Sequence, residues 1–198
     1  MKEFKVRLTL LEDALGMTPA DPKIHEEYIA SKAPDAQSIE EEVESMGVDA
    51  VVEKGMTVFP KLEDGTPFLW DYQIRGLMKD ACGMLRRVPG TKSSKMKAYK
   101  KIIDGNIFVS PRKIPFTLSG PLGNCQRPLR ASTPQGERVA LANSETVPAG
   151  SSVEFTVLCL NDEDAYTVDE WLEYGTLRGL GQWRNGGWGR FEYDVIDG

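Results

Sequence analysis

The order in which strand and helix patterns alternate along the chain constrains its fold most. Apolar and polar residues alternate at residues 4–10, in the period-two pattern of a half-buried strand. Residues 71–88 instead carry apolar side chains at helical spacing, with Asp71 as the expected N-cap. The buried stripe of this helix is predicted to contain Ile74, Leu77, Met78, Ala81 and Leu85.

Downstream of this helix the chain changes mainly to strands. A polar hinge is predicted at residues 91–94 and a short basic helix after Met96, followed by a helix at 164–177 and a closing strand at 191–195. Short strands are predicted at residues 56–60, 107–109, 113–118, 127–133, 138–142 and 153–160. This order predicts an α+β fold with a ferredoxin-like β-α-β-β-α-β core, an antiparallel sheet and extra hairpins.

An acidic segment interrupts this plan. At 198 residues the chain is long enough for one domain with its own core, so we expect a single domain over 1–198 with a helical insertion at 18–55. The insertion carries an acidic run at residues 40–44. Such a face is usually only solvated, but it could instead mimic nucleic-acid phosphates or contact a basic neighbour.

The net charge of -6 hides a strong segregation of charge. Residues 12–64 hold 14 acidic and 4 basic side chains, whereas residues 71–138 hold 4 acidic and 14 basic ones. Concentrated Lys and Arg are typical of a surface that neutralises phosphates, although solvated helix faces beside acidic neighbours would give the same count. The candidate phosphate contacts here are Arg75, Lys79, Arg86, Arg87, Lys92, Lys95, Lys97, Lys100, Lys101, Arg127 and Arg130.

The most informative segment is residues 178–191, which contain five glycines, three arginines and two tryptophans. Glycine lets another backbone approach closely, arginine pairs with phosphate, and tryptophan offers a face on which a base stacks. The alternative is a tight helix-to-strand connection whose tryptophans pack into the sheet. The candidate binding residues are Arg178, Gly179, Gly181, Gln182, Trp183, Arg184, Gly187, Trp188 and Arg190.

This segment resembles the C-terminal glycine-rich loop of the RAMP superfamily, the ferredoxin-like, RRM-like RNA-binding proteins of CRISPR effector complexes. Residues 70–76 (WDYQIRG) resemble the start of that family's first helix, and residues 147–150 (VPAG) resemble its late hairpin. A fainter similarity links the chain to prophage proteins. The resemblance covers most of the chain outside the acidic insertion and implies that a nucleic-acid backbone is gripped, often by head-to-tail copies. The matching positions are Arg75, Gly76, Gly179, Gly181, Gly186, Gly187 and Gly189.

These observations favour a non-enzymatic protein that binds single-stranded nucleic acid, with RNA favoured over DNA. It is expected to act as a homo-oligomer or as a subunit of a ribonucleoprotein complex in CRISPR- or phage-related antiviral defence, with no cofactor and no metal. Three widely spaced cysteines predict free thiols in a reducing cytoplasm. Because no stretch approaches about 18 apolar residues, neither a signal peptide nor a membrane anchor is expected.

Two other functions stay open. The first is a phage-borne protein-interaction module, an anti-CRISPR or decoy, that acts through the acidic insertion. The second is a metal-independent endoribonuclease, for which His25 is the one histidine and Tyr72 or Tyr99 are substitutes. The carboxylates of Asp13, Asp21, Glu26 and Glu27 offer oxygen ligands, but clustered carboxylates on an exposed helix are usually solvated. No catalytic set is predicted.

Overall fold

The computed structural model describes residues 1–20, 56–133 and 136–197. The described chain divides into two compact units. Unit 1 comprises residues 1–14, 60–121 and 147–198, and unit 2 comprises residues 15–59 and 122–146. His25 and the acidic run at 40–44 lie outside the described residues. The single domain with an insertion at 18–55 therefore stays a prediction.

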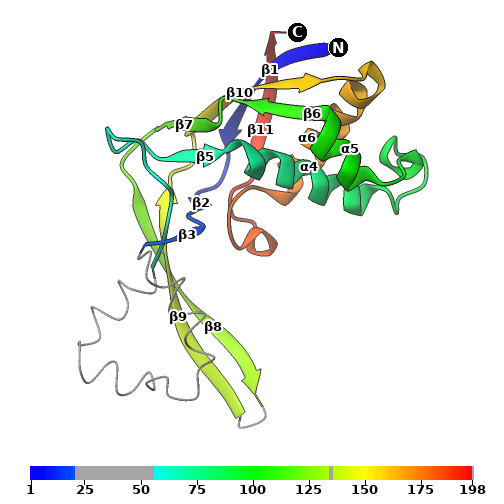
Figure 1. Cartoon of the computed structure of the whole chain (residues 1–198). Coiled ribbons are helices and arrows are strands. Elements are labelled where there is room, and N and C mark those ends of the chain that lie inside the picture. The colour runs from blue at the N-terminus through cyan, green and yellow to red at the C-terminus, as the bar shows by residue number, and fades with distance from the viewer. Residues whose placement is uncertain (21–55, 134–135, 198) are drawn as a thin grey trace, which may run out of the picture. The chain divides into compact units, whose positions relative to one another are not determined.

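Unit 1 is built on an antiparallel sheet with strand order β11-β1-β10-β7-β5 (Figure 1). In this sheet β1 (Lys2–Leu10) lies between β10 (Ser152–Cys159) and β11 (Phe191–Asp197). The far edge of β10 pairs with both β6 (Ile107–Ser110) and β7 (Lys113–Thr117). The short strand β5 (Phe68–Trp70) completes the sheet beside β7.

The predicted alternation of the first strand is confirmed. Phe4, Val6, Leu8 and Leu10 are buried, whereas the residues between them are exposed or half-buried. Strand β10 shows the same alternation, so one face of the sheet is apolar. Such a face must be covered by another layer.

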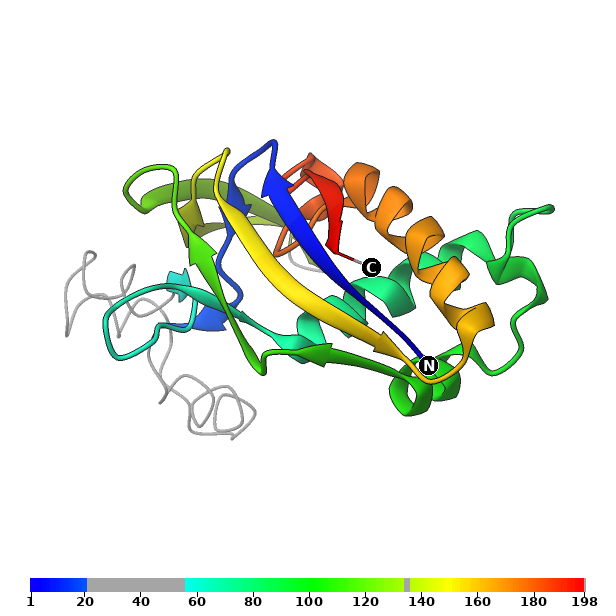
Figure 2. The same cartoon turned by 90° about the horizontal axis from the view of Figure 1, so that it is seen from above.

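That layer consists of α4 (Asp71–Leu85) and α6 (Asp162–Arg178), with α5 (Tyr99–Asn106) beside α4. Figure 2 shows β1 and β10 crossing in front of α4. The core lies between the layers and includes Ile74, Met78, Trp171 and Leu172. The predictions of an α+β fold and an antiparallel sheet are confirmed.

Helix α4 differs from its prediction at both ends. Trp70, not Asp71, is the N-cap, and its backbone N–H donates to Gln73 Oε1 at 2.7 Å. The helix ends at Leu85 instead of residue 88, and Leu85 is half-buried. Pro89 disfavours helical backbone at the residue before it, which explains the early end.

Unit 2 contains a second sheet. The long hairpin of β8 (Gly123–Thr133) and β9 (Gly136–Val147) extends the strands predicted at 127–133 and 138–142. Strand β4 (Met56–Val58) runs parallel to β9 and antiparallel to β3 (Thr18–Pro19), and β2 (Ala14–Leu15) pairs with β9. Glu145 Oε2 accepts from the Phe59 N–H at 3.0 Å, which fixes the end of β4.

The three cysteines are free thiols, as predicted. Burial raises the pKa of Cys82, and it raises the pKa of Cys159 to about 11. Both buried thiols are therefore protonated and serve as small core residues. None of the described helices is long and apolar enough to cross a bilayer.

Candidate nucleic-acid interface

The glycine-rich loop between α6 and β11 closes through backbone contacts that only glycine permits. Gly179 and Gly189 have φ of +81° and +68°. A Cβ on Gly189 would lie 2.0 Å from the Leu180 carbonyl oxygen, and a Cβ on Gly179 would lie 2.5 Å from the Trp188 oxygen. Because the Leu180 N–H also donates to the Gly189 oxygen at 2.8 Å, these two glycines form the neck of the loop.

The two tryptophans of the loop stack on each other. Their ring centroids are 6.1 Å apart with 15° between the planes, and Gly186 lies against both rings. Trp183 is 43% exposed, and Trp188 is half-buried. The alternative that both pack into the sheet is wrong for Trp183, whose ring offers an open surface of the kind on which bases stack.

One carboxylate joins this loop to helix α4. Asp80 Oδ2 pairs with Arg178 Nε at 3.2 Å and with Arg184 Nη1 at 3.0 Å. Arg178 also donates to Asn185 of the loop. The glycine-rich loop and α4, which are about a hundred residues apart in sequence, therefore form one surface with two arginines at its centre.

A hollow of about 470 Å³ lies beside the loop. Arg190 Nη2 pairs here with Glu12 Oε1 at 3.0 Å, and the Gly189 N–H donates to the backbone carbonyl oxygen of Asp13 at 2.8 Å. A phosphate bound by Arg190 would have to replace Glu12. The hollow is lined by Glu12, Asp13, Gly186, Gly187, Trp188 and Arg190.

The predicted residues within α4 are engaged by neighbours on the same unit. Arg75 pairs with Asp71 one turn away at 3.2 Å, and Lys79 pairs with Asp104 of α5 at 2.5 Å. Gly76 faces solvent, and a Cβ there would have nothing within 4 Å. Packing therefore does not explain this glycine inside a helix.

The other predicted cations of unit 1 lie on the connection between α4 and α5 and on the first turn of α5, here called the basic connection (residues 86–101). All of them are exposed, and no ion pair is found for them within the described part of the chain. They give this part of unit 1 a concentration of exposed positive charge. Its members are Arg86, Arg87, Lys92, Lys95, Lys97, Lys100 and Lys101.

Hydrogen bonds from Lys92 and Ser93 to α6 hold the basic connection against that helix, an arrangement here called the clasp. The predicted hinge at residues 91–94 is therefore wrong. Ser93 is fully buried in a short 3-10 turn, η1 (Ser93–Lys95). Its hydroxyl donates to Glu170 Oε1 at 2.6 Å and accepts from Trp171 Nε1 at 2.9 Å. The N–H groups of Lys92 and Ser93 donate to the same carboxylate at 2.7 and 3.1 Å. A buried polar network replaces the expected flexible joint because each of these groups has a partner.

This clasp predicts a pH dependence. Burial raises the pKa of Glu170, but the hydrogen bonds from Ser93 and from the Lys92 backbone outweigh burial and lower it. A carboxyl with a lowered folded pKa stabilises the fold above its unfolded pKa of about 4.3, and this contribution is lost as pH falls through the folded value. We expect Glu170→Gln to be less stable than wild type at pH 7 and the difference to shrink below about pH 4.

Denaturant unfolding of both proteins from pH 7 to pH 3 measures this difference in unfolding free energy. Glu173→Gln is the control, because Glu173 is exposed on the same helix. It is expected to stay within about 0.5 kcal/mol of wild type throughout. A difference between Glu170→Gln and wild type that did not change with pH would contradict the role given to the Glu170 carboxylate.

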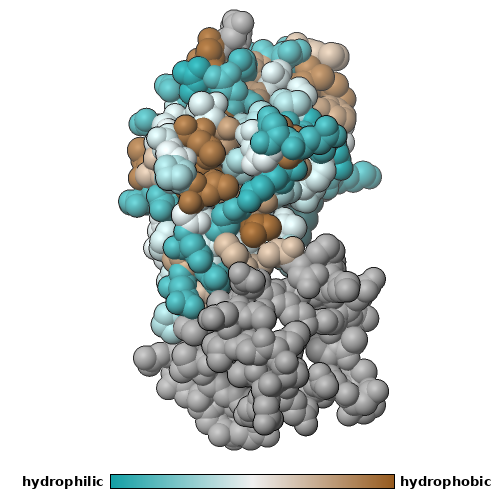
Figure 3. Space-filling model, turned by 90° about the vertical axis from the view of Figure 1, so that its left-hand side faces the viewer, coloured by the Kyte–Doolittle hydropathy of each residue, from teal (hydrophilic) through white to brown (hydrophobic). Residues whose placement is uncertain are grey.

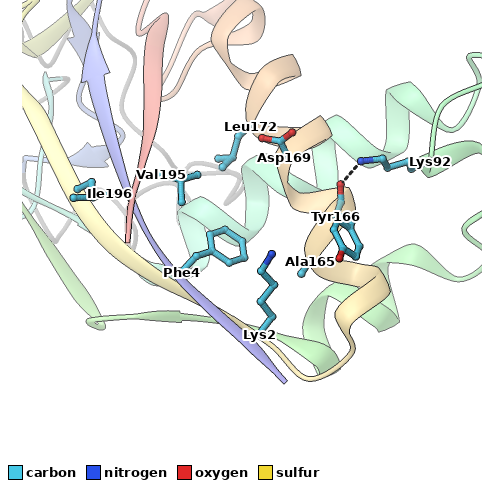
Figure 4. A pocket seen from close by; sticks show the side chains of 9 residues that line it. All are labelled: Lys2, Phe4, Lys92, Ala165, Tyr166, Asp169, Leu172, Val195 and Ile196. Carbon is cyan, nitrogen blue, oxygen red and sulfur yellow. Dashed lines mark hydrogen bonds between the residues drawn. The ribbon is translucent and has the colours of Figure 1, made fainter. Parts of the chain in front are cut away.

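Lys92 also borders a cavity of about 540 Å³ between α6, β1 and β11 (Figure 4). Its Nζ donates to the Tyr166 carbonyl at 2.7 Å, while Lys2 Nζ lies 5.2 Å from the centroid of the Tyr166 ring. Asp169 accepts a 2.6 Å hydrogen bond from the Tyr193 hydroxyl, and burial together with this bond raises the pKa of Tyr193. Lys92, Lys2 and Asp169 of this cavity thus each already have a partner.

The two remaining predicted cations belong to unit 2. Arg127 is buried in β8, and its Nη1 donates to Ser144 Oγ at 3.1 Å. Arg130 lies further along β8, and its side chain is outside the described part. The structure thus places the predicted residues in three sets: the loop with α4, the basic connection, and the β8 strand of unit 2.

Sequence reasoning missed two acidic partners and one aromatic cluster. Asp80 and Glu12 hold the loop arginines, but nothing in their local sequence indicates these long-range pairs. Trp70 and Tyr72 stack on each other and lie beside Arg112. The two aromatic residues are close in sequence, but the cations beside them come from residues about 40 positions away, so local sequence does not indicate this cluster.

No family model matches the sequence, and no curated protein does. Among solved structures, a chain of the Type III-B Cmr-beta complex bound to cognate target RNA matches with a TM-score of 0.56 at 12% identity. The fold of this chain is therefore similar to that of a chain found in a CRISPR complex. That match covers 99% of this chain but 61% of the other, so this chain spans about three fifths of its length.

A second similar structure comes from a Type IV-B CRISPR complex. Its chain matches with a TM-score of 0.50 at 13% identity, over 98% of this chain and 90% of the other. At these identities the likeness concerns the fold alone. Two CRISPR complexes of different types thus contain chains of similar fold.

Proposed function

We propose that this protein is a non-enzymatic RNA-binding subunit of a CRISPR-type ribonucleoprotein complex, built on a ferredoxin-like core in unit 1. In chain order, β1, α4, the β6–β7 region, β10, α6 and β11 give the sequence β-α-β-β-α-β. The RAMP-like motifs in the sequence and the two similar CRISPR structures support this proposal. The RNA bound in the Cmr-beta structure favours RNA over DNA as the ligand class.

The observation that carries the proposal is the surface formed by the glycine-rich loop and α4. Asp80 holds Arg178 and Arg184 there, next to the stacked pair of Trp183 and Trp188. Arginines beside exposed aromatic rings suit single-stranded nucleic acid, because cations take the phosphates and the rings stack with bases. The exposed basic connection adds a longer-range attraction to the same unit.

The test compares two double variants that each remove two positive charges. We expect Arg184→Ala with Arg190→Ala to weaken binding of single-stranded RNA about tenfold at physiological salt. The slope of log affinity against log salt should fall by about 1.4, because each lost phosphate contact on a single strand contributes about 0.7. Fluorescence polarisation of a labelled oligonucleotide across a salt series measures both quantities.

The matched control is Lys5→Ala with Arg7→Ala. Both side chains are 45% exposed on β1, and both pair with Glu154, so they resemble the loop arginines in charge and pairing. This control is expected to change the salt slope by less than about 0.3. Equal slopes for the two double variants would remove the loop from the interface, and absence of RNA binding by the wild type would overturn the proposed function.

The same experiment separates the alternatives. A gel of the recovered oligonucleotide is expected to show intact RNA, and cleaved RNA would favour the endoribonuclease. The protein-interaction module acts through the acidic segment at 18–55, most of which lies outside the described residues. A wild type without affinity for RNA or DNA at low salt would favour that module.

A further inference from the structure

A second group of aromatic and cationic side chains lies at the junction of β5 and α4. The Trp70 and Tyr72 rings stack with centroids 6.1 Å apart and 15° between their planes. The ring of Phe68 packs edge-on against the Trp70 ring, with the two ring centroids 4.9 Å apart. Phe68 is itself buried, so it holds Trp70 in place from the core side. Tyr72 is 51% exposed. The stack thus ends in an aromatic face that is open to solvent.

Two cations flank this stack. Arg112 Cζ lies 5.5 Å and Lys113 Nζ lies 5.9 Å from the centroid of Trp70. The Asp71 carboxylate fixes Arg112 at 3.0 Å, and the Asp71 N–H donates to the Arg112 carbonyl at 3.0 Å. The Arg112 side chain remains 68% exposed. These four residues, Trp70, Tyr72, Arg112 and Lys113, are called the aromatic platform.

The aromatic platform lies on the same side of α4 as the glycine-rich loop. Tyr72, Gly76 and Asp80 follow each other at intervals of four residues, which places them along one face of the helix. Asp80 holds the loop arginines. Gly76 lies between Tyr72 and Asp80 on the helix and has no side chain to fill the space there. Eight residues of helix rise about 12 Å, the length of three to four stacked nucleotides at about 3.4 Å each.

We propose that the aromatic platform is a second base-binding subsite, where Tyr72 stacks with a base of single-stranded RNA and Arg112 and Lys113 contact the neighbouring phosphates. This inference rests on the proposed function and extends it. The bound strand would run along α4, with one base on the platform and another on the loop tryptophans.

The chemistry of the platform favours nucleic acid over a protein partner. Figure 3, which views unit 1 from the side of β5 and β7, shows hydrophobic residues in separate patches among hydrophilic ones. A stable protein interface is usually built around a contiguous apolar centre depleted of charge. An exposed ring, Tyr72, stacked on the half-buried, cation-flanked ring of Trp70 instead matches the arrangement that binds single strands with little sequence preference.

The test measures binding of a fluorescein-labelled uridine oligonucleotide to the full chain and its variants. Tyr72→Ala is expected to weaken binding about 5- to 150-fold, the range for loss of one stacked base, without changing the salt slope. Tyr72→Phe keeps the ring and is expected to bind within about twofold of wild type. Arg112→Ala should lower the salt slope by about 0.7.

The matched control is Tyr166→Ala. Tyr166 is 61% exposed on α6 and also has a cation over its ring, but it lies outside the proposed path of the strand. It is expected to bind RNA within about twofold of wild type. If Tyr72→Ala binds RNA as tightly as wild type while the loop double variant loses affinity, the platform proposal is overturned and the proposed function stands. Absence of binding by the wild type would overturn both.

Discussion

Gly189→Ala is expected to destabilise unit 1 by about 3 kcal/mol or more. The φ of +68° alone costs an L-residue about 1–2 kcal/mol. The new Cβ would lie 2.0 Å from the Leu180 carbonyl oxygen, a backbone atom that cannot rotate away. Relief of this clash must open the neck of the loop and break the Leu180 to Gly189 hydrogen bond, which adds about 1 kcal/mol.

Tryptophan fluorescence during denaturant unfolding measures this effect. The four tryptophans all belong to unit 1, so the signal reports the stability of that unit. Gly76→Ala is the control, because its Cβ would enter open space within a helix and is expected to stabilise the fold by about 0.5–1 kcal/mol. A Gly189→Ala protein as stable as wild type would contradict the described neck.

The contrast between these two glycines shows what the sequence alone predicts about the site. Both fall within motifs that resemble the RAMP family, and the sequence shows only that Gly76 lies in a predicted helix and Gly189 in a predicted loop. The structure shows that Gly189 is required by a close backbone approach, whereas Gly76 has no packing role. That difference depends on a contact between Leu180 and Gly189 across the loop, which local composition does not encode.

Elements with strong local periodicity were predicted well. The alternation in β1 and the stripe of α4 are set by which side chains must leave water, and this is visible in sequence. The three-residue strand β5 has no such periodicity, because it forms only by pairing with β7. The aromatic platform depends on that pairing, which places Lys113 opposite Trp70. It could therefore be recognised only in the folded chain.

The distribution of charge shows the same limit of prediction from sequence alone. The basic middle segment was visible as a count, and the exposed basic connection agrees with it. The count did not show that Asp80 holds Arg178 and Arg184, or that Arg127 is buried against Ser144. Ion pairs between segments far apart in sequence are set by topology. Counts along the chain therefore indicate the sign of a surface and not which cations are available to a ligand.

The second large effect is expected at the clasp of the basic connection, where Trp171→Ala should destabilise unit 1 by about 3–5 kcal/mol. Trp171 is among the largest fully buried side chains, so its removal leaves a cavity between α6 and its neighbours. The variant also removes the indole N–H that donates to Ser93. In a chain of this length the midpoint of thermal unfolding should fall by about 6–20 °C.

Two further variants show which part of this loss of stability comes from the buried side-chain volume. One removes the hydrogen bond but keeps most of the volume, and the other removes an exposed tryptophan. Trp171→Phe keeps most of the buried ring and is expected to lose only about 1–2 kcal/mol, with the lost bond to Ser93 as one cause. Trp183→Ala, at an exposed ring of the same unit, should change stability by less than about 1 kcal/mol. Fluorescence of the remaining tryptophans during unfolding gives all three values.

The amides of Lys92 and Ser93 provide an independent measurement of the clasp. Because both donate to Glu170, the residue preceding Trp171, loss of packing at Trp171 should speed their hydrogen exchange. Exchange at these amides that stayed at the wild-type rate in Trp171→Ala would show that Glu170 holds the connection without help from the core. A loss of stability below about 1 kcal/mol in Trp171→Ala would contradict the packing role given to this side chain.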